Sequence, residues 1–123
     1  MNASELFEIL LADAAKREEL KADSSAFTVR HSLDQEAIQF VKQLDWDGLN
    51  AQASALIEKR FHECLVYMPN TANANENLIK EFTEFARGFW PDGYKRHRLD
   101  AVAFLRWLKS KKMPVDRREL YWN

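Results

Sequence analysis

LNAQASALIEKRFHECLVYM, residues 49–68, carries the longest helical pattern in the chain. Its apolar residues recur every three or four positions across five turns, which places them on one face of an α-helix. The stripe consists of Leu49, Ala53, Leu56, Ile57, Phe61, Cys64, Leu65 and Met68. Asp45 can act as the N-cap. We therefore expect a long helix from about Trp46 to Tyr67 that faces a core.

Two short helices are expected at the N-terminus. Asn2 and Glu5 have the spacing of a capping box ahead of SELFEILLAD, residues 4–13, where apolar residues recur at helical spacing. Asp13 can cap a second helix over AAKREELKAD, residues 14–23. The charged residues of this second segment indicate a largely solvated face.

A loop and a third helix are expected next. DSSAFTVRHS, residues 23–32, combines β-branched residues with serines, which is typical of a loop or a short irregular turn. Ser32 and Gln35 form a second capping box that opens LDQEAIQFVKQL, residues 33–44. The side chains expected to face the core are Leu33, Ala37, Phe40, Val41 and Leu44.

The helical pattern breaks after the long stripe. MPNTANAN, residues 68–75, interrupts it because Pro69 disfavours a helical conformation at the preceding residue and asparagines prefer caps and turns. A further helix is predicted from about Asn75 to Phe89. The turn PDG, residues 91–93, is expected to end it.

A final strong helix is predicted from about Leu99 to Lys111. Met113 and Pro114 end it, and VDRRELYWN, residues 115–123, is expected to form a short turn or tail. This tail contains three side chains that are too apolar to be left unpacked, namely Leu120, Tyr121 and Trp122.

Composition supports a helical, globular chain. Apolar residues make up 46% and charged residues 30% of the 123 residues, and there are only three glycines and three prolines. No segment shows sustained alternation or internal repeats. We expect an all-α fold, a compact bundle of about five to six helices in a single helical domain over residues 1–123.

The chain has no signal for a membrane or for export. No apolar run approaches the roughly 18 residues needed to span a bilayer, and the N-terminal MNASELFEIL has acidic residues where a signal peptide would be basic. Cys64, the single cysteine, cannot form an internal disulfide, which fits a reducing compartment. We expect a cytoplasmic protein without membrane contact.

Charge is distributed unevenly along the chain. Residues 1–85 hold 8 Lys and Arg against 15 Asp and Glu, for a net charge of -7, whereas residues 86–123 hold 10 against 4, for +6. The positive field of the last third can steer an acidic partner to it. The alternative is that this basic part folds back onto the acidic part of the same chain.

Catalytic signatures are missing. The sequence has no glycine-rich phosphate loop, no GxSxG and no pair of CxxC motifs. Glu58 and His62 share a helix face and would hold a metal only with a third ligand, so a solvated pair is the simpler reading. Cys64 lies on the apolar stripe and is read as a small buried hydrophobe. We expect neither an enzyme nor a cofactor in this chain.

Residues 88–108, GFWPDGYKRHRLDAVAFLRWL, combine aromatic and basic side chains next to a turn. This composition is typical of interface hot spots, although ordinary core packing explains it as well. Phosphate contact is possible, but sequence reading of a duplex is not expected, because the basic cluster precedes the predicted helix. The candidate partner-binding or peptide-binding residues are Phe89, Trp90, Tyr94, Lys95, Arg96, Arg98 and Trp107.

The order of segments resembles a group of small helical bacterial proteins. It runs through LFEILLADAAKREELKAD, HSLDQEAIQFVKQLD and LNAQASALIEKRFHECLVYMP to a phenylalanine-rich helix and HRLDAVAFLRWL. The most distinctive positions are Glu58-Lys59-Arg60, Pro69 and residues 100–108. These features resemble the accessory proteins of DUF692-type multinuclear non-haem iron oxidative enzymes, which modify ribosomally made peptides, as in the pathway to 3-thiaglutamate.

The resemblance implies a non-catalytic subunit of a heterodimer. Such a subunit binds the iron enzyme and helps to recognise the precursor peptide, and the iron belongs to the enzyme. No strand pattern for capturing a peptide by β-augmentation is present, so a helix-lined groove is expected instead. The alternative is a small nucleic-acid-binding module that uses the basic C-terminal third.

Overall fold

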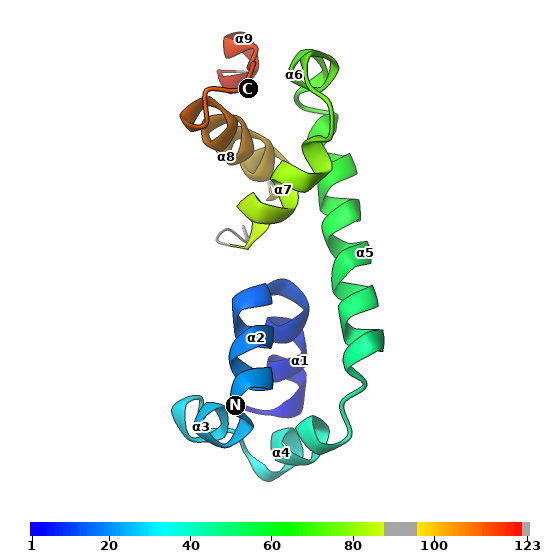
Figure 1. Ribbon diagram of the computed structural model, residues 1–123, viewed down its shortest axis with the longest axis vertical. Coiled ribbons are helices and arrows are strands. Elements are labelled where there is room, and N and C mark those ends of the chain that lie inside the picture. Colours follow the sequence, from blue (N-terminus) through cyan, green and yellow to red (C-terminus); the bar gives the residue numbers. More distant parts are fainter. Residues whose placement is uncertain (88–95, 122–123) are drawn as a thin grey trace. The chain divides into compact units, whose positions relative to one another are not determined.

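The computed structural model describes residues 1–87 and 96–121, and every regular element in these ranges is a helix (Figure 1). The predicted all-α fold is confirmed. Nine helices occur in the described residues, against the five to six expected, and none of them is long and apolar enough to cross a membrane. They are α1 (Ala3–Ala12), α2 (Ala14–Ala22), α3 (Ser24–Arg30), α4 (Gln35–Lys42), α5 (Trp46–Leu65), α6 (Pro69–Ala74), α7 (Leu78–Ala86), α8 (Arg96–Ser110) and α9 (Arg117–Leu120).

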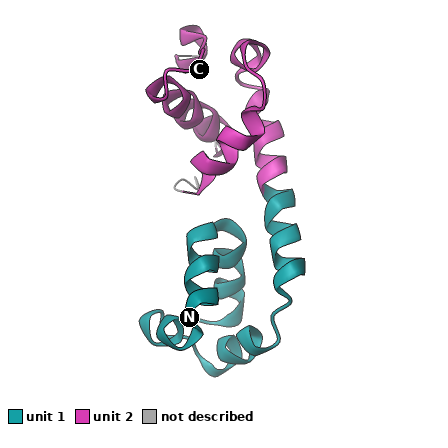
Figure 2. Cartoon of the chain, in the orientation of Figure 1, with its two compact units in different colours: residues 1–56 teal, residues 57–123 magenta. Residues whose placement is uncertain are grey.

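The chain divides into two compact units, residues 1–56 and residues 57–123 (Figure 2). The division falls within α5, and each unit has a hydrophobic core of its own. The expectation of a single domain over residues 1–123 stays a prediction.

The first two helices begin where the sequence predicts. Asn2 Oδ1 accepts a hydrogen bond from the backbone N–H of Glu5 at 2.9 Å. Asp13 Oδ1 accepts hydrogen bonds from the backbone N–H groups of Ala15 at 3.0 Å and Lys16 at 3.2 Å. Asp13 also follows the last residue of α1, so one aspartate turns the chain directly from α1 into α2.

Helix α3 corrects the expectation of a loop over residues 23–32. Asp23 caps it by accepting a hydrogen bond from Ala26 N at 3.0 Å. Phe27, in the middle of the helix, is completely buried in the core of residues 1–56. The β-branched residues and serines of this segment have weak helix propensity, and burial of one large aromatic side chain overrides it.

Helix α4 is capped two residues later than the sequence pattern suggests. Asp34 Oδ1 accepts a hydrogen bond from Ala37 N at 2.9 Å, and the helix begins at Gln35. Ser32, the expected cap, has a φ of 50° and lies in the turn that follows α3. An N-cap residue needs an extended backbone, so Ser32 cannot take this role.

The core of residues 1–56 is aliphatic with one buried aromatic ring. The fully or largely buried side chains are Leu6, Leu10, Leu20, Phe27, Leu33, Ala37 and Leu49. Phe7 and Phe40 pack edge to face beside it, with ring centroids 5.9 Å apart. Of the predicted core positions, Leu33 and Ala37 are buried, and Phe40, Val41 and Leu44 are partly buried.

A polar cluster around Glu19 joins α2 to the end of α3. Glu19 Oε1 lies 3.1 Å from Nε2 of His31 and accepts a short hydrogen bond from Arg30, while Lys16 Nζ is 3.2 Å from Glu19 Oε2. The hydrogen bond with His31, followed by those with Lys16 and Arg30, lowers the pKa of Glu19 to about 2. Glu19 therefore stays ionised in mild acid.

Glu19 predicts an acid-dependent loss of stability. Because its pKa is lower in the folded chain than the ordinary value of 4.5, its contribution is fully present above that pH and is lost as the pH falls through about 2. In thermal melts, the wild-type chain should exceed Glu19→Gln in Tm at pH 6, and the gap should shrink between pH 4.5 and pH 2. A gap that stays constant over this range would contradict the assignment.

Helix α5 begins at the predicted cap. Asp45 Oδ1 accepts a hydrogen bond from Gly48 N at 3.1 Å. The helix ends at Leu65, two residues before the expected Tyr67, and Met68 is completely buried beyond its end.

Helix α6 corrects the expectation that residues 68–75 only interrupt the helical pattern. Helix α5 ends at Leu65, and Pro69 is the first residue of α6, with Met68 in the N-cap position. Proline suits this place because the N–H that it lacks would have no partner within the helix.

Helices α7 and α8 differ from their predicted bounds at their N-terminal ends. Helix α7 follows Asn77, which has a φ of 56°, and begins three residues later than expected. Helix α8 includes Arg96, three residues before the predicted start. Phe89 and the turn at residues 91–93 lie outside the described residues.

The core of residues 57–123 is rich in phenylalanine. Phe82 lies at its centre, with ring centroids 5.1 Å from Phe104 and 5.6 Å from Phe61. The buried members are Phe61, Cys64, Met68, Leu78, Phe82, Phe85, Ala86, Ala101, Phe104, Leu105 and Leu108. Leu120 packs partly against this core. Tyr121 is exposed, which contradicts the expectation that it is packed, and Trp122 lies outside the described residues.

Candidate binding surfaces on residues 57–123

The predicted binding residues fall into two groups. Arg96 is exposed in the first turn of α8, and Arg98 and Trp107 are partly buried on the same helix. The other four predicted residues, Phe89, Trp90, Tyr94 and Lys95, lie outside the described residues. Only the α8 side of the predicted surface can therefore be placed.

Trp107 packs within its own unit. Its ring is stacked on Phe104 with centroids 6.2 Å apart, and Lys111 Nζ lies 4.0 Å from the Trp107 ring centroid. Lys111 is held there by Glu84 at 3.3 Å and Glu81 at 3.5 Å. These contacts favour the core-packing interpretation of this tryptophan.

The basic cluster begins α8 instead of preceding it. Arg96, His97 and Arg98 all lie in its first turn, which corrects the expectation from the sequence. His97 Nδ1 lies 2.8 Å from Glu63 Oε2 of α5. This contact joins the first turn of α8 to α5.

A buried ion pair joins α5 to α8. Arg60 donates hydrogen bonds from Nε to Asp100 Oδ2 at 3.1 Å and from Nη2 to Asp100 Oδ1 at 2.6 Å, and both residues are almost completely buried. The Arg60 guanidinium also lies 5.4 Å from the Phe82 ring centroid. Asp100 is therefore the partner of a buried arginine.

The sequence contains a signal that Arg60 is buried, although Arg60 is not one of the apolar residues of the stripe. Arg60 stands four residues before Cys64, so it shares the apolar face of α5. An arginine on a buried face needs an anionic partner. Asp100 was a candidate for that role.

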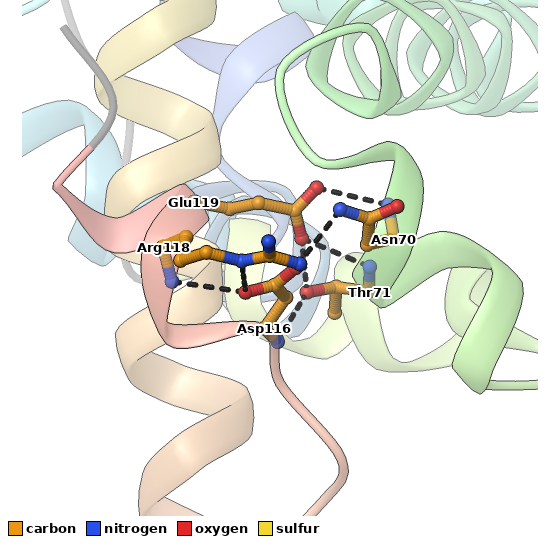
Figure 3. A network of polar contacts seen from close by, with 5 residues as sticks. All are labelled: Asn70, Thr71, Asp116, Arg118 and Glu119. Atoms are coloured by element: carbon orange, nitrogen blue, oxygen red, sulfur yellow. Dashed lines mark hydrogen bonds and ion pairs between the residues drawn. The ribbon is translucent and has the colours of Figure 1, made fainter.

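Helix α6 is capped by a carboxylate from the C-terminal end of the chain (Figure 3). Glu119 Oε2 accepts a hydrogen bond from Asn70 N at 2.9 Å, and Glu119 Oε1 accepts from Thr71 N at 2.9 Å and Thr71 Oγ1 at 2.6 Å. Met68, in the N-cap position, has no side chain that can accept these bonds. A residue 48 positions away thus replaces a local cap.

Asp116 completes this network. Its backbone N–H donates to Thr71 Oγ1 at 3.0 Å, and its Oδ2 accepts from Asn70 Nδ2 at 2.8 Å (Figure 3). Hydrogen bonds from Arg118 lower the pKa of Asp116 to about 2. The network fixes α9 against α6 and so shapes the surfaces on either side of α9.

An apolar cavity of 370 Å³ lies between the α5–α6 connection and α9. It is lined by Val66, Tyr67, Pro69, Asn70, Arg118 and Glu119. Val66 is 75% exposed and Tyr67 is exposed as well. An exposed valine and tyrosine at the rim of an apolar cavity are typical of a surface that another molecule covers.

A second cavity, of 450 Å³, lies between the last turns of α8 and the end of α9, and we call it the α8–α9 groove. It is lined by Arg106, Lys109, Ser110, Leu120 and Tyr121. It shares no lining residue with the apolar cavity. Residues 57–123 therefore offer two separate surfaces of different character, one apolar and one basic.

The candidate metal pair and the cysteine show no special arrangement. Glu58 and His62 are both exposed, and no group of three or more His, Cys, Asp or Glu side chains that would hold a metal occurs in residues 1–87 and 96–121. Cys64 is completely buried, and burial raises the pKa of its thiol. The prediction that Cys64 is a buried hydrophobe is confirmed.

Comparisons with known proteins do not identify a family for this chain. No protein-family model matches the chain, and neither the curated proteins nor the solved structures contain a match.

Proposed function

We propose that this chain is a cytoplasmic, non-catalytic accessory subunit. In this proposal it forms a bacterial heterodimer with a multinuclear iron enzyme of the DUF692 type and helps to recognise the ribosomally made precursor peptide. The iron belongs to the enzyme. The order of helical segments supports the choice of partner, and the two surfaces of residues 57–123 support a role in binding.

The observation that carries the proposal is the apolar cavity beside the α5–α6 connection. Val66 is 75% exposed and lies between Leu65, which packs against the core of residues 57–123, and the cavity residue Tyr67. Full burial of a valine is worth about 1.5 to 3 kcal/mol, so a partner that covers it gains appreciable affinity. We assign this cavity to the enzyme.

Val66→Asp tests this assignment against a matched control. Val29→Asp makes the same change at the 81% exposed Val29 of α3, which does not line the cavity. In affinity capture from native cytosol, with mass spectrometry and an iron assay of the eluate, the wild-type chain should recover the iron enzyme. Val66→Asp should weaken that binding at least about tenfold, since a charge would be buried in an interface.

One outcome would contradict this function, and another would contradict only the assigned docking surface. Recovery of no iron protein by the wild-type chain would exclude the accessory role. Equal recovery by Val66→Asp and Val29→Asp would keep the role but remove the apolar cavity as the docking surface. Thermal melts of both variants control for loss of folding.

A nucleic-acid-binding module is the second candidate. Arg96, Arg106 and Lys109 are exposed along α8, which is the observation in its favour. Helix α8 buries Ala101, Phe104, Leu105 and Leu108 in the core, so little of it is open to a duplex. Oligonucleotide binding that falls steeply as salt rises is the result that would favour this function.

A further inference from the structure

The α8–α9 groove has a positive lining. Arg106 and Lys109 lie one turn apart on α8 and are both exposed. Neither has an ion-pair partner among the described residues. A favourable interaction with the helix dipole accounts for Lys109 in the last turn of α8, but it does not account for Arg106 further in.

Four acidic side chains of the same unit already have partners of their own. Glu81 and Glu84 pair with Lys111, Asp116 pairs with Arg118, and Glu119 accepts hydrogen bonds from α6. No acidic residue is among the described residues that line the groove. The described lining thus holds two cations and no carboxylate.

The far side of the groove is apolar. Tyr121 is 75% exposed, and Leu120 is partly buried beside it. Ser110 lies on the α8 side, where its hydroxyl donates to Trp107 O at 2.6 Å and so cannot donate to a ligand. A ligand that fits this lining carries negative charge on one side and an apolar side chain on the other.

We propose that the α8–α9 groove binds an acidic peptide segment with an apolar side chain next to its carboxylates. Arg106 can hold one carboxylate with two N–H groups of its guanidinium, and Lys109 can hold a second as a point charge. Tyr121 and Leu120 cover the apolar side chain. The identification of this peptide with the precursor peptide rests on the proposed function.

A peptide fits the groove better than a nucleic acid does. An oligonucleotide carries a phosphate at every nucleotide, whereas two cations are among the described residues that line the groove, so most phosphates would have no partner among them. A peptide segment can space two carboxylates around one apolar residue. The volume of the α8–α9 groove, 450 Å³, is in the range of pockets that hold a few side chains.

The test is fluorescence anisotropy with three labelled probes of equal length. The first is a peptide of about 12 residues with glutamates on both sides of a central phenylalanine, a length that exceeds the groove. In the second, glutamine replaces every glutamate, and the third is an oligothymidylate. We expect the acidic peptide to bind the full chain at least about tenfold more tightly than either of the others.

Matched variants place the binding in the groove. Arg106→Glu with Lys109→Glu should weaken acidic-peptide binding at least about tenfold, because two attractive charges become repulsive. Lys59→Glu with Lys80→Glu makes the same charge change at two exposed positions of the same unit and should leave affinity within about twofold. Tyr121→Ala tests the apolar side without any change of charge and should also weaken binding.

The outcomes separate this inference from the proposed function. The inference fails if the glutamine peptide binds as well as the acidic one, if the oligothymidylate binds best, or if both charge-reversal pairs weaken binding equally. Capture of the iron enzyme without acidic-peptide binding would overturn the groove alone. Peptide binding lost in the Arg106 and Lys109 variant but kept in Val66→Asp would support two separate surfaces, whether or not the enzyme is recovered.

Discussion

Asp100→Ala is expected to destabilise the chain by about 3 to 5 kcal/mol. Asp100 is 1% exposed and Arg60 is 6% exposed, and the two share a bidentate contact at 2.6 and 3.1 Å. Removal of the carboxylate takes away the acceptor of two hydrogen bonds from a buried guanidinium. Urea unfolding, followed by far-UV circular dichroism, measures the free energy of unfolding. Glu58→Ala, at an exposed position of α5, should change it by less than about 0.5 kcal/mol.

A double replacement distinguishes the ion pair from packing. Arg60→Met combined with Asp100→Leu removes both charges and keeps apolar volume, so most of the lost stability should return. If Asp100→Ala costs less than about 1 kcal/mol, the pair does not contribute as the geometry indicates. If the double variant is as unstable as the single one, packing at this position and not charge accounts for the loss.

The sequence predicts the helices that depend on local signals. The caps at Asn2, Asp13 and Asp45 are correct because an N-cap contacts residues only two or three positions away. The stripe of α5 is likewise correct, since periodicity reports burial directly. The all-α fold follows from such local patterns.

Three helices were not predicted from the sequence, namely α3, α6 and α9, and α9 forms within the segment expected to be a turn or tail. Of these, α3 and α6 depend on distant contacts. Helix α3 forms around Phe27, which is buried among residues from other helices of its unit. Helix α6 has only six residues and is capped by Glu119, 48 positions from Thr71. A helix of this length has little stability of its own. No pattern within residues 68–75 reveals the residue that stabilises it.

The candidate surfaces were predicted less well than the fold. The basic and aromatic residues of the C-terminal third predicted a binding surface that includes α8. Arg96 of this helix is exposed, whereas Trp107 packs in its own unit. The α8–α9 groove combines residues from two helices that the sequence pattern could not bring together. The face of α8 that is available for binding is the one that does not pack against the core. Tertiary packing determines this face, and the local sequence pattern does not.

Glu119→Ala is expected to cost about 2 to 3 kcal/mol of stability and also to weaken binding at both surfaces. The change removes the acceptor of three hydrogen bonds, and Thr71 is completely buried, so water cannot easily replace them. Arg117→Ala, at an exposed position of the same helix, is the matched control. Urea unfolding should show the difference, and Glu119→Gln should fall between the two because it keeps one acceptor oxygen.

The effect of Glu119→Ala on binding follows from the position of α9 between the two cavities. Glu119 and Arg118 line the apolar cavity, and Leu120 and Tyr121 line the α8–α9 groove. Without the hydrogen bonds to α6, we expect α9 to shift, and the α9 residues that line the two cavities would shift with it. Below the unfolding transition, Glu119→Ala should therefore reduce capture of the enzyme and affinity for the acidic peptide together, whereas Val66→Asp reduces only the former. Full binding at both surfaces in Glu119→Ala would show that α9 holds its position without this carboxylate.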